Sequence, residues 1–155
     1  MSTILVVDDT QLARDAIGKI LEYEGFETLR ARNGREAWAM MYQHRPDLIL
    51  LDLMMPEMDG VTFLSLVRRD PRWRGMPVVV LTGADDKDHL ITRAWDLGVN
   101  DLVPKATFGV DDLVGRIRHH LAATPAPAPK TAGPAVAPPE TPRWRATTSR
   151  WAESA

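Results

Sequence analysis

The stretch that decides the fold runs from Asp47 to Gly60 and reads Asp-Leu-Ile-Leu-Leu-Asp-Leu-Met-Met-Pro-Glu-Met-Asp-Gly. Four consecutive aliphatic residues, 48–51, lead directly into a lone carboxylate, Asp52. A short apolar run bounded by turn residues is typical of a strand that is buried on both faces of a parallel sheet. A charge at the end of such a strand needs a cation or hydrogen bonds to compensate its loss of water. The dipeptide Asp59-Gly60 predicts a turn in which Gly60 can adopt positive φ.

Two other apolar runs also end in polar side chains. Residues 4–7 lead into Asp8 and Asp9, and residues 78–81 lead into Thr82. Two weaker runs, 26–31 and 100–103, are predicted as outer strands, and Lys105 follows the second of them after one proline.

Helical patterns separate these runs. The predicted helices extend from Thr10 to Gly25, from Asn33-Gly34 to Pro46, and over about 61–69, 86–97 and 110–121. Thr10 is expected to cap the first helix. Strand and helix alternate five times, which predicts an α/β fold with a parallel sheet and right-handed crossovers. The weak outer strands favour a five-stranded, flavodoxin-like (βα)5 doubly wound sheet in the order 2-1-3-4-5.

Composition limits the class of protein. The 155 residues suffice for about one domain, and 45% hydrophobic and 26% charged residues are ordinary for a soluble globular protein. The net charge of -2 argues neither for nor against nucleic acid. The chain has no cysteine, so disulfides and thiolate metal sites are excluded. It begins without the features of a signal peptide and has no apolar run of the ~20 residues that span a bilayer, which predicts a cytoplasmic protein with no membrane contact.

The predicted topology brings carboxylates together. Asp8 and Asp9 end strand 1 and Asp52 ends strand 3, and these strands flank the switch point where doubly wound sheets bind ligands. Three carboxylates in a small crevice need a cation, and an open site of hard oxygen ligands suits Mg²⁺. Beside the metal an Asp52 oxygen can attack phosphorus and form an acyl phosphate. Lys105 offers an ammonium for one phosphoryl oxygen and Thr82 a hydroxyl for another.

At these residues the sequence resembles the CheY-like receiver domain of two-component response regulators. The resemblance covers about residues 1–121 and depends on four motifs: Val7-Asp8-Asp9, Leu51 to Pro56 with Asp59-Gly60, Leu81-Thr82-Gly83, and Lys105.

The resemblance implies a phosphoacceptor that belongs to a signalling pathway. Asp52 would accept a phosphoryl group from a sensor histidine kinase or a phosphotransfer protein. Asp9, Asp52 and the backbone carbonyl of Met54 would ligate Mg²⁺, with Asp8 assisting. Thr82 and Lys105 would complete the site. The expected product is a phosphoprotein that signals as a single-domain response regulator and has no enzymatic activity beyond its own phosphorylation and dephosphorylation.

Two positions depart from the family pattern. The family usually has proline directly after the lysine, whereas Ala106 follows Lys105 here. It often has an aromatic residue three positions before the lysine, and this chain has Leu102.

The phosphorylated domain is expected to signal through the surface of helix 86–97, strand 100–103 and helix 110–121. The expected target is a protein, and direct DNA binding is not expected. The chain is expected to be a monomer or a phosphorylation-dependent dimer.

Two rival functions fit the sequence less well. Leu102 and Ala106 favour an atypical receiver that works as an unphosphorylated scaffold, although the acidic, hydroxyl and lysine residues form a complete set. A phosphatase with an aspartyl nucleophile would need a second carboxylate two residues after Asp52, and Met54 occupies that place.

The tail differs in composition from the rest. Residues 122–142 are rich in alanine and proline and predict an extended linker. Residues 143–155 carry Trp144 and Trp151 among arginines, which suits either a docking peptide or a disordered end. No second folded domain is expected there.

Three tryptophans lie outside the tail. Packing is the favoured role for Trp38 and Trp95 on helical faces and for Trp73 in the basic loop 71–76.

Overall fold

The computed structural model of the chain describes residues 1–55, 59–83, 88–105 and 108–123. The chain divides into two compact units, Met1–Pro125 and Ala126–Ala155. The second unit, with the predicted docking segment and most of the predicted linker, lies outside the described residues, as do Pro56 and Ala106.

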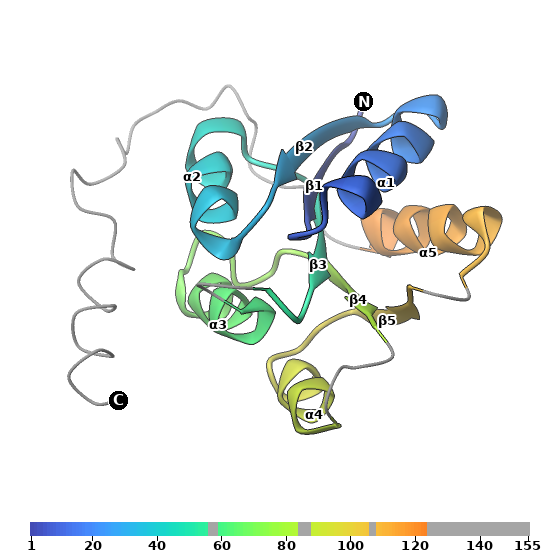
Figure 1. Cartoon of the computed structure of the whole chain (residues 1–155). Coiled ribbons are helices and arrows are strands. Elements are labelled where there is room, and N and C mark those ends of the chain that lie inside the picture. The colour runs from blue at the N-terminus through green and yellow to red at the C-terminus, as the bar shows by residue number, and fades with distance from the viewer. Residues whose placement is uncertain (56–58, 84–87, 106–107, 124–155) are drawn as a thin grey trace. The chain divides into compact units, whose positions relative to one another are not determined.

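Strand and helix alternate along the first unit (Figure 1). The strands are β1 (Thr3–Val7), β2 (Glu27–Ala31), β3 (Leu48–Asp52), β4 (Val78–Thr82) and β5 (Asp101–Pro104). The helices are α1 (Gln11–Tyr23), α2 (Gly34–His44), α3 (Gly60–Arg69), α4 (Asp88–Asp96) and α5 (Val110–Ala123). α5 therefore ends two residues beyond the boundary predicted at residue 121.

The predicted sheet is confirmed. All neighbouring strands pair in parallel, in the order β2-β1-β3-β4-β5. The two weak runs are the outer strands, as their composition predicted. The register pairs Val7 of β1 with Leu51 of β3, and Thr82 of β4 with Pro104 of β5. Asp52 pairs with Leu81, the residue before Thr82, so the polar strand ends are staggered by about one residue along the carboxyl edge of the sheet.

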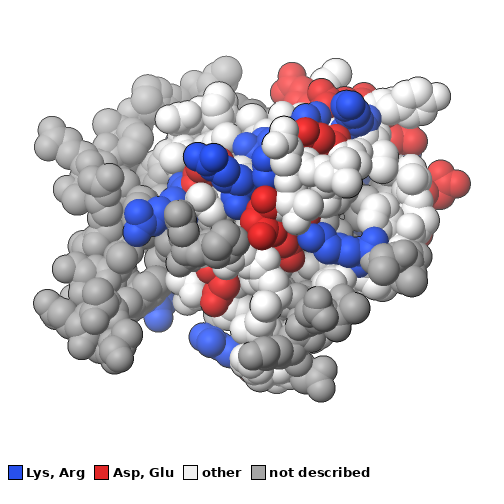
Figure 2. Space-filling view, in the orientation of Figure 1, with Lys and Arg blue, Asp and Glu red and all other residues white. Residues whose placement is uncertain are grey.

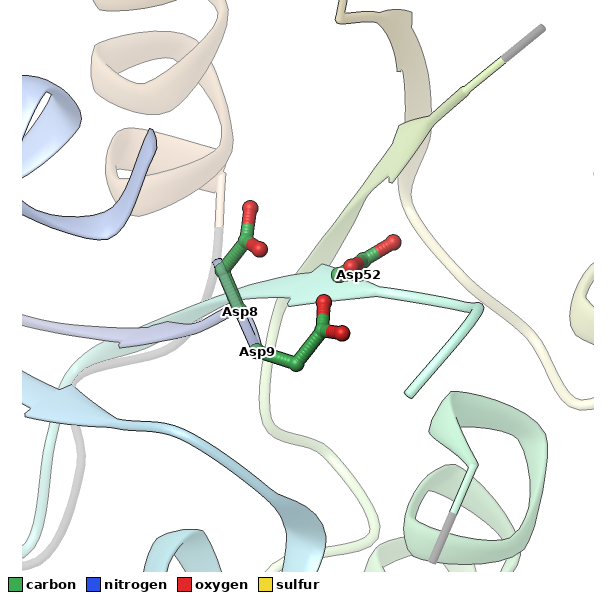
Figure 3. A group of neighbouring side chains, drawn as sticks. All are labelled: Asp8, Asp9 and Asp52. Atoms are coloured by element: carbon green, nitrogen blue, oxygen red, sulfur yellow. The ribbon is translucent and has the colours of Figure 1, made fainter. Parts of the chain in front are cut away.

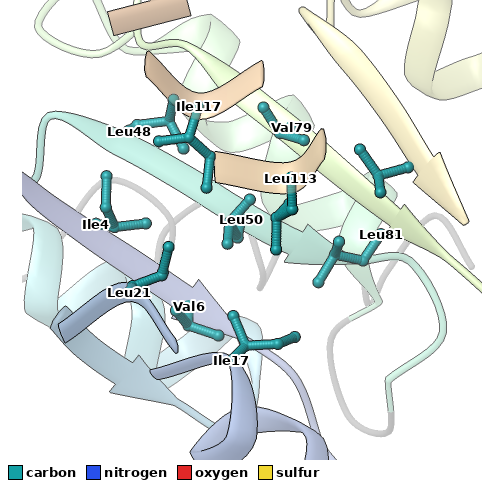
Figure 4. Packing of buried hydrophobic residues seen from close by; sticks show 11 residues of the cluster. Ile4, Val6, Ile17, Leu21, Leu48, Leu50, Val79, Leu81, Leu113 and Ile117 are labelled. Carbon is teal, nitrogen blue, oxygen red and sulfur yellow. The ribbon is translucent and has the colours of Figure 1, made fainter. Parts of the chain in front are cut away.

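The core lies on both faces of the sheet. β1 and β3 are buried along their whole length, as expected for strands covered on each side. On one face, residues of β1, β3, β4 and β5 pack against α1 and α5 (Figure 4). This cluster consists of Ile4, Val6, Ile17, Leu21, Leu48, Leu50, Val79, Leu81, Val103, Leu113 and Ile117. Figure 1 shows α2, α3 and α4 on the opposite side from α1 and α5.

The tryptophans only partly match their predicted roles. Trp38 and Trp73 are buried, and Trp38 meets Phe63 of α3 edge to face at a centroid distance of 6.4 Å. The prediction that Trp95 packs is wrong, because its side chain is 50% exposed. Ala94 is the fully buried residue among those of α4 whose burial is described, and the next residue of a helix points about 100° away from it. No helix in the described part of the chain is long and apolar enough to cross a membrane.

Candidate functional site

The connection from β1 to α1 carries the first two carboxylates. Asp8 is fully buried, and its Oδ1 accepts a hydrogen bond of 2.9 Å from the backbone N–H of Thr10. Thr10 occupies the N-cap position of α1, but its side chain makes no capping hydrogen bond, which corrects the prediction. The side chain of Asp8 therefore fixes this turn. Asp9, the next residue, is exposed.

Asp52 is the last residue of β3 and is only 3% exposed. Its Oδ1 accepts a hydrogen bond of 3.3 Å from the backbone N–H of Met54, which is itself 42% exposed. Burial raises the pKa of Asp52 to about 7, against the opposing effect of Lys105 and with a further upward contribution from the Asp8 carboxylate. The carboxyl group is thus held where its charge is poorly compensated by the protein alone.

Gly60 has a different role from the one predicted. It is the first residue of α3. Asp59 caps this helix, because its Oδ1 accepts a hydrogen bond of 2.7 Å from the N–H of Thr62. Among the described glycines, positive φ occurs at Gly25 and Gly98 and not at Gly60. A Cβ added to Gly60 would lie 2.4 Å from the backbone oxygen of Asp52. Glycine is required because the helix start packs directly against the end of the acceptor strand.

The three carboxylates meet at one edge of the sheet (Figure 3). One oxygen from each of Asp8, Asp9 and Asp52 lies within 4.8 Å of the other two. The donors are all hard oxygens, two of the three residues are buried, and the third opens to solvent. Such a set fits a hard divalent cation of the Mg²⁺ type, which takes one or two carboxylates and keeps several waters.

Lys105 places a positively charged side chain beside the carboxylates. Its Nζ lies 2.8 Å from Oδ2 of Asp8 and 3.4 Å from Oδ2 of Asp52. Burial lowers the pKa of Lys105, but the two carboxylates more than offset this, so the pKa is raised. One ammonium cannot neutralise three ionised carboxylates, so the site retains an excess of negative charge.

Thr82 reaches the same edge from β4. The backbone N–H of Lys105 donates a hydrogen bond of 2.8 Å to the carbonyl oxygen of Thr82, which joins the ends of β4 and β5. Figure 2 shows acidic atoms near the middle of the visible face, with basic atoms on both sides. The structure thus brings together the side chains of Asp8, Asp9, Asp52 and Lys105, and it places Thr82 at the end of the neighbouring strand. The chemical role of each residue stays a prediction.

A family model described as the response regulator receiver domain matches residues 4–118. The chain belongs to this family. Receiver domains act in two-component signalling, interact with histidine kinases or phosphotransfer proteins, and typically use Mg²⁺ at an acidic pocket.

Curated relatives extend beyond this receiver domain. The DNA-binding dual master transcriptional regulator RpaA of Synechocystis is 36% identical over 124 residues, which cover 80% of this chain and 51% of that protein. The phosphate regulon transcriptional regulatory protein PhoB of Pseudomonas aeruginosa is 35% identical over 122 residues, covering 79% and 52%. The chain therefore spans about half the length of these relatives.

Solved structures match over almost the whole receiver domain. A CheY-like response regulator receiver domain protein from Methanospirillum hungatei has a TM-score of 0.73 at 26% identity, over 79% of this chain and 95% of that one. The signal receiver domain of a signal transduction histidine kinase from Syntrophus aciditrophicus has a TM-score of 0.72 at 32% identity, over 79% and 92%.

Sequence reasoning missed one residue next to this receiver's acidic site. Nη1 of Arg14 in α1 donates a hydrogen bond of 2.7 Å to the backbone carbonyl of Asp8. The contact could not be read from a motif, because it depends on how the first turn of α1 lies over the end of β1. Leu102, at the position of the missing aromatic, is half-buried in β5.

Proposed function

We propose that Asp52 is the phosphoacceptor of this receiver domain. The observation that carries the proposal is a nearly buried carboxylate at the end of β3 with an ammonium 3.4 Å away and two further carboxylates within 4.8 Å. Burial alone would favour a protonated, unreactive acid, so the positive charge of Lys105, and of a cation when one is bound, has to sustain the ionised form. This arrangement suits a carboxylate that acts as a nucleophile beside a bound cation.

Asp8, Asp9, Asp52 and the backbone carbonyl of Met54 would hold Mg²⁺. When bound, the metal would supply positive charge to the carboxylates and to the incoming phosphoryl oxygens. The excess of carboxylates over the single lysine supports this assignment, because an uncompensated cluster of this charge would otherwise oppose folding.

Transfer consists of one bond formed and one broken. An Asp52 oxygen bonds to phosphorus while the phosphorus–nitrogen bond of a donor phosphohistidine breaks, and the electron pair stays on the imidazole nitrogen. The Lys105 ammonium would pair with one phosphoryl oxygen, and the Thr82 hydroxyl would donate a hydrogen bond to another. Because little covalent chemistry is asked of the protein, positioning and charge compensation are its main contribution.

The phosphorylated domain would signal through protein contacts. Thr82 and Lys105 stand at the ends of β4 and β5, so a phosphoryl group held by both would act on the connections to α4 and α5. We therefore propose the surface of α4, β5 and α5 as the output face, with a protein as its target. The half-exposed Trp95 of α4 belongs to that surface.

Intact-mass measurement after incubation with acetyl phosphate and Mg²⁺ tests the proposal. The wild-type chain should gain one phosphoryl group, and Asp52→Asn should gain none, because an amide cannot form the acyl phosphate. Asp96→Asn, an exposed site on α4, is the matched control and should be labelled like the wild type.

Two outcomes would contradict the proposal in different ways. Equal labelling of Asp52→Asn would show that another residue is the acceptor. A wild-type chain that takes up no phosphoryl group, yet binds its partner, would support the unphosphorylated scaffold instead.

A further inference from the structure

The connection between β1 and α1 carries two of the three site carboxylates on a very short segment. Three hydrogen bonds hold it at Asp8: Asp8 N–H to the Ala31 carbonyl at 3.0 Å, Thr10 N–H to Asp8 Oδ1 at 2.9 Å, and Arg14 Nη1 to the Asp8 carbonyl at 2.7 Å. The first only continues the pairing of β1 with β2. The second occupies an oxygen of a carboxylate that is itself in the site. The third comes from a side chain outside the acidic group.

The bond from Arg14 answers a structural need. Asp8 is fully buried, and a buried carbonyl requires a donor. A guanidinium donor makes a stronger hydrogen bond than a neutral one. The backbone N–H of Arg14 donates to the Thr10 carbonyl at 2.9 Å, but this is the first hydrogen bond of α1 and does not depend on the side chain. The contact that is particular to arginine is the one from Nη1 to Asp8.

We infer that Arg14 is a positioning residue for the cation site. It holds the backbone at Asp8 and so sets where the exposed carboxylate of Asp9, the next residue, comes to lie. The inference rests on the proposed function, since it assumes that Asp8, Asp9 and Asp52 bind Mg²⁺. Arg14 touches neither metal nor substrate in this role and acts only through the backbone.

Charge and positioning predict opposite effects when Arg14 is replaced. If Arg14 acted only through its charge, it would repel a divalent cation, and an uncharged residue would bind Mg²⁺ more tightly. If it positions the carboxylates, an uncharged residue without the donor loosens the connection and Mg²⁺ binds more weakly. The sign of the change in affinity therefore separates the two roles.

A Mg²⁺ titration of the full chain, followed by amide NMR shifts, provides the test. Arg14→Met keeps the length of the stem but removes charge and donor, and should weaken Mg²⁺ binding about tenfold, as is typical when a residue that orients metal ligands is lost. Arg14→Leu is a second uncharged variant without a donor and should weaken binding in the same direction. Arg14→Lys retains a charged donor and should remain closer to the wild type.

Matched controls separate this inference from the proposed site. Lys19→Ala removes one positive charge from an exposed position of the same helix and should bind Mg²⁺ like the wild type. The thermal unfolding midpoint without Mg²⁺ shows whether each variant is folded. If the wild type binds no Mg²⁺, or if Asp9→Asn binds it equally well, the proposed cation site is wrong. If these two behave as expected and the uncharged Arg14 variants bind Mg²⁺ as tightly as the wild type or more tightly, the positioning role is wrong.

Discussion

Two aspartates at strand ends have pKa values that are shifted in opposite directions by their surroundings. Asp52 ends β3, where burial and the Asp8 carboxylate outweigh Lys105 and raise its pKa to about 7. Asp101 begins β5, where burial raises its pKa but hydrogen bonds from His120 and the Leu102 N–H, together with Arg116, lower it more. The first carboxylate is poorly compensated and the second is well compensated, which suits a reactive group and a structural one.

At this scale we predict that Asp101→Asn destabilises the fold at neutral pH. Oδ1 of Asp101 accepts a hydrogen bond of 2.7 Å from Nη1 of Arg116, and its Oδ2 lies 3.0 Å from Nε2 of His120. Arg116 also forms an ion pair with Asp112. Because the folded pKa of Asp101 is lowered, its ionised form contributes stability that is complete above the unfolded value of about 3.9 and is lost as pH falls through the lower folded value. The free energy of unfolding should fall by about 1 kcal/mol at pH 7.

Urea denaturation at several pH values measures this effect. The difference between the wild type and Asp101→Asn should shrink as the pH falls below about 4, where the carboxyl of the unfolded chain becomes protonated, and should vanish below the lowered pKa of the folded chain. Asp112→Asn, at the exposed partner of Arg116, should cost much less. A difference that is independent of pH would show that the carboxylate charge is not the cause.

At the scale of elements, one side chain joins three segments on the side of the molecule away from the site. Arg68, in the last turn of α3, donates to the carbonyls of Leu97 and Gly98 after α4 and to those of Arg74 and Met76 before β4. These hydrogen bonds are 2.8 to 3.0 Å long. The guanidinium satisfies carbonyls just after the carboxyl end of α4, where positive charge is favourable, and carbonyls of the turn before β4.

Arg68→Ala should therefore loosen α4 in particular. Four carbonyls lose a charged donor, so we expect the free energy of unfolding to fall by about 2–4 kcal/mol. Denaturant unfolding gives the global value, and hydrogen exchange should accelerate at residues 97–100 more than in β1 or β3. Arg93→Ala, at an exposed position of α4, is the control and should change little. Uniform acceleration over the whole sheet would contradict a local role for Arg68.

At the scale of the whole molecule, the parallel sheet assembles the site. Residues at 8, 52, 82 and 105 are far apart in the chain, yet each ends or follows a strand whose carboxyl end lies at the same edge. The core that supports this edge is complete within the first unit, since the main cluster draws its members from residues 4 to 117.

A chain that ends at Pro125 should consequently keep its thermal unfolding midpoint within a few degrees of the full-length value. A chain that ends at Arg116 is the control, because it loses Ile117, a fully buried member of the core, and should be strongly destabilised. Differential scanning calorimetry of the three chains makes the comparison. A large loss of stability on removing residues 126–155 would show that the second unit contributes to folding.

Most of the fold could be predicted because the strands are short apolar runs with turn residues at both ends. The alternation of strand and helix and the weakness of the outer strands led to the sheet order that is observed. Local packing could not be predicted. Thr10 has a capping composition, but Asp8 fixes the turn. Gly60 follows an aspartate as in a tight turn, but glycine is required there by the close approach of the Asp52 backbone rather than by positive φ.

By itself the sequence determined the class of fold, the strand order and the group of polar residues at the strand ends. It could do so because hydrophobic periodicity and turn residues act over a few neighbouring positions. Only the tertiary structure decided how those residues are charged and supported: the burial that raises the pKa of Asp52, the pairing of Lys105 with Asp8, and the hydrogen bond from Arg14. The first two depend on atoms that are distant in the chain and close in space, and the third depends on how the first turn of α1 lies over the end of β1. No sequence pattern records any of them.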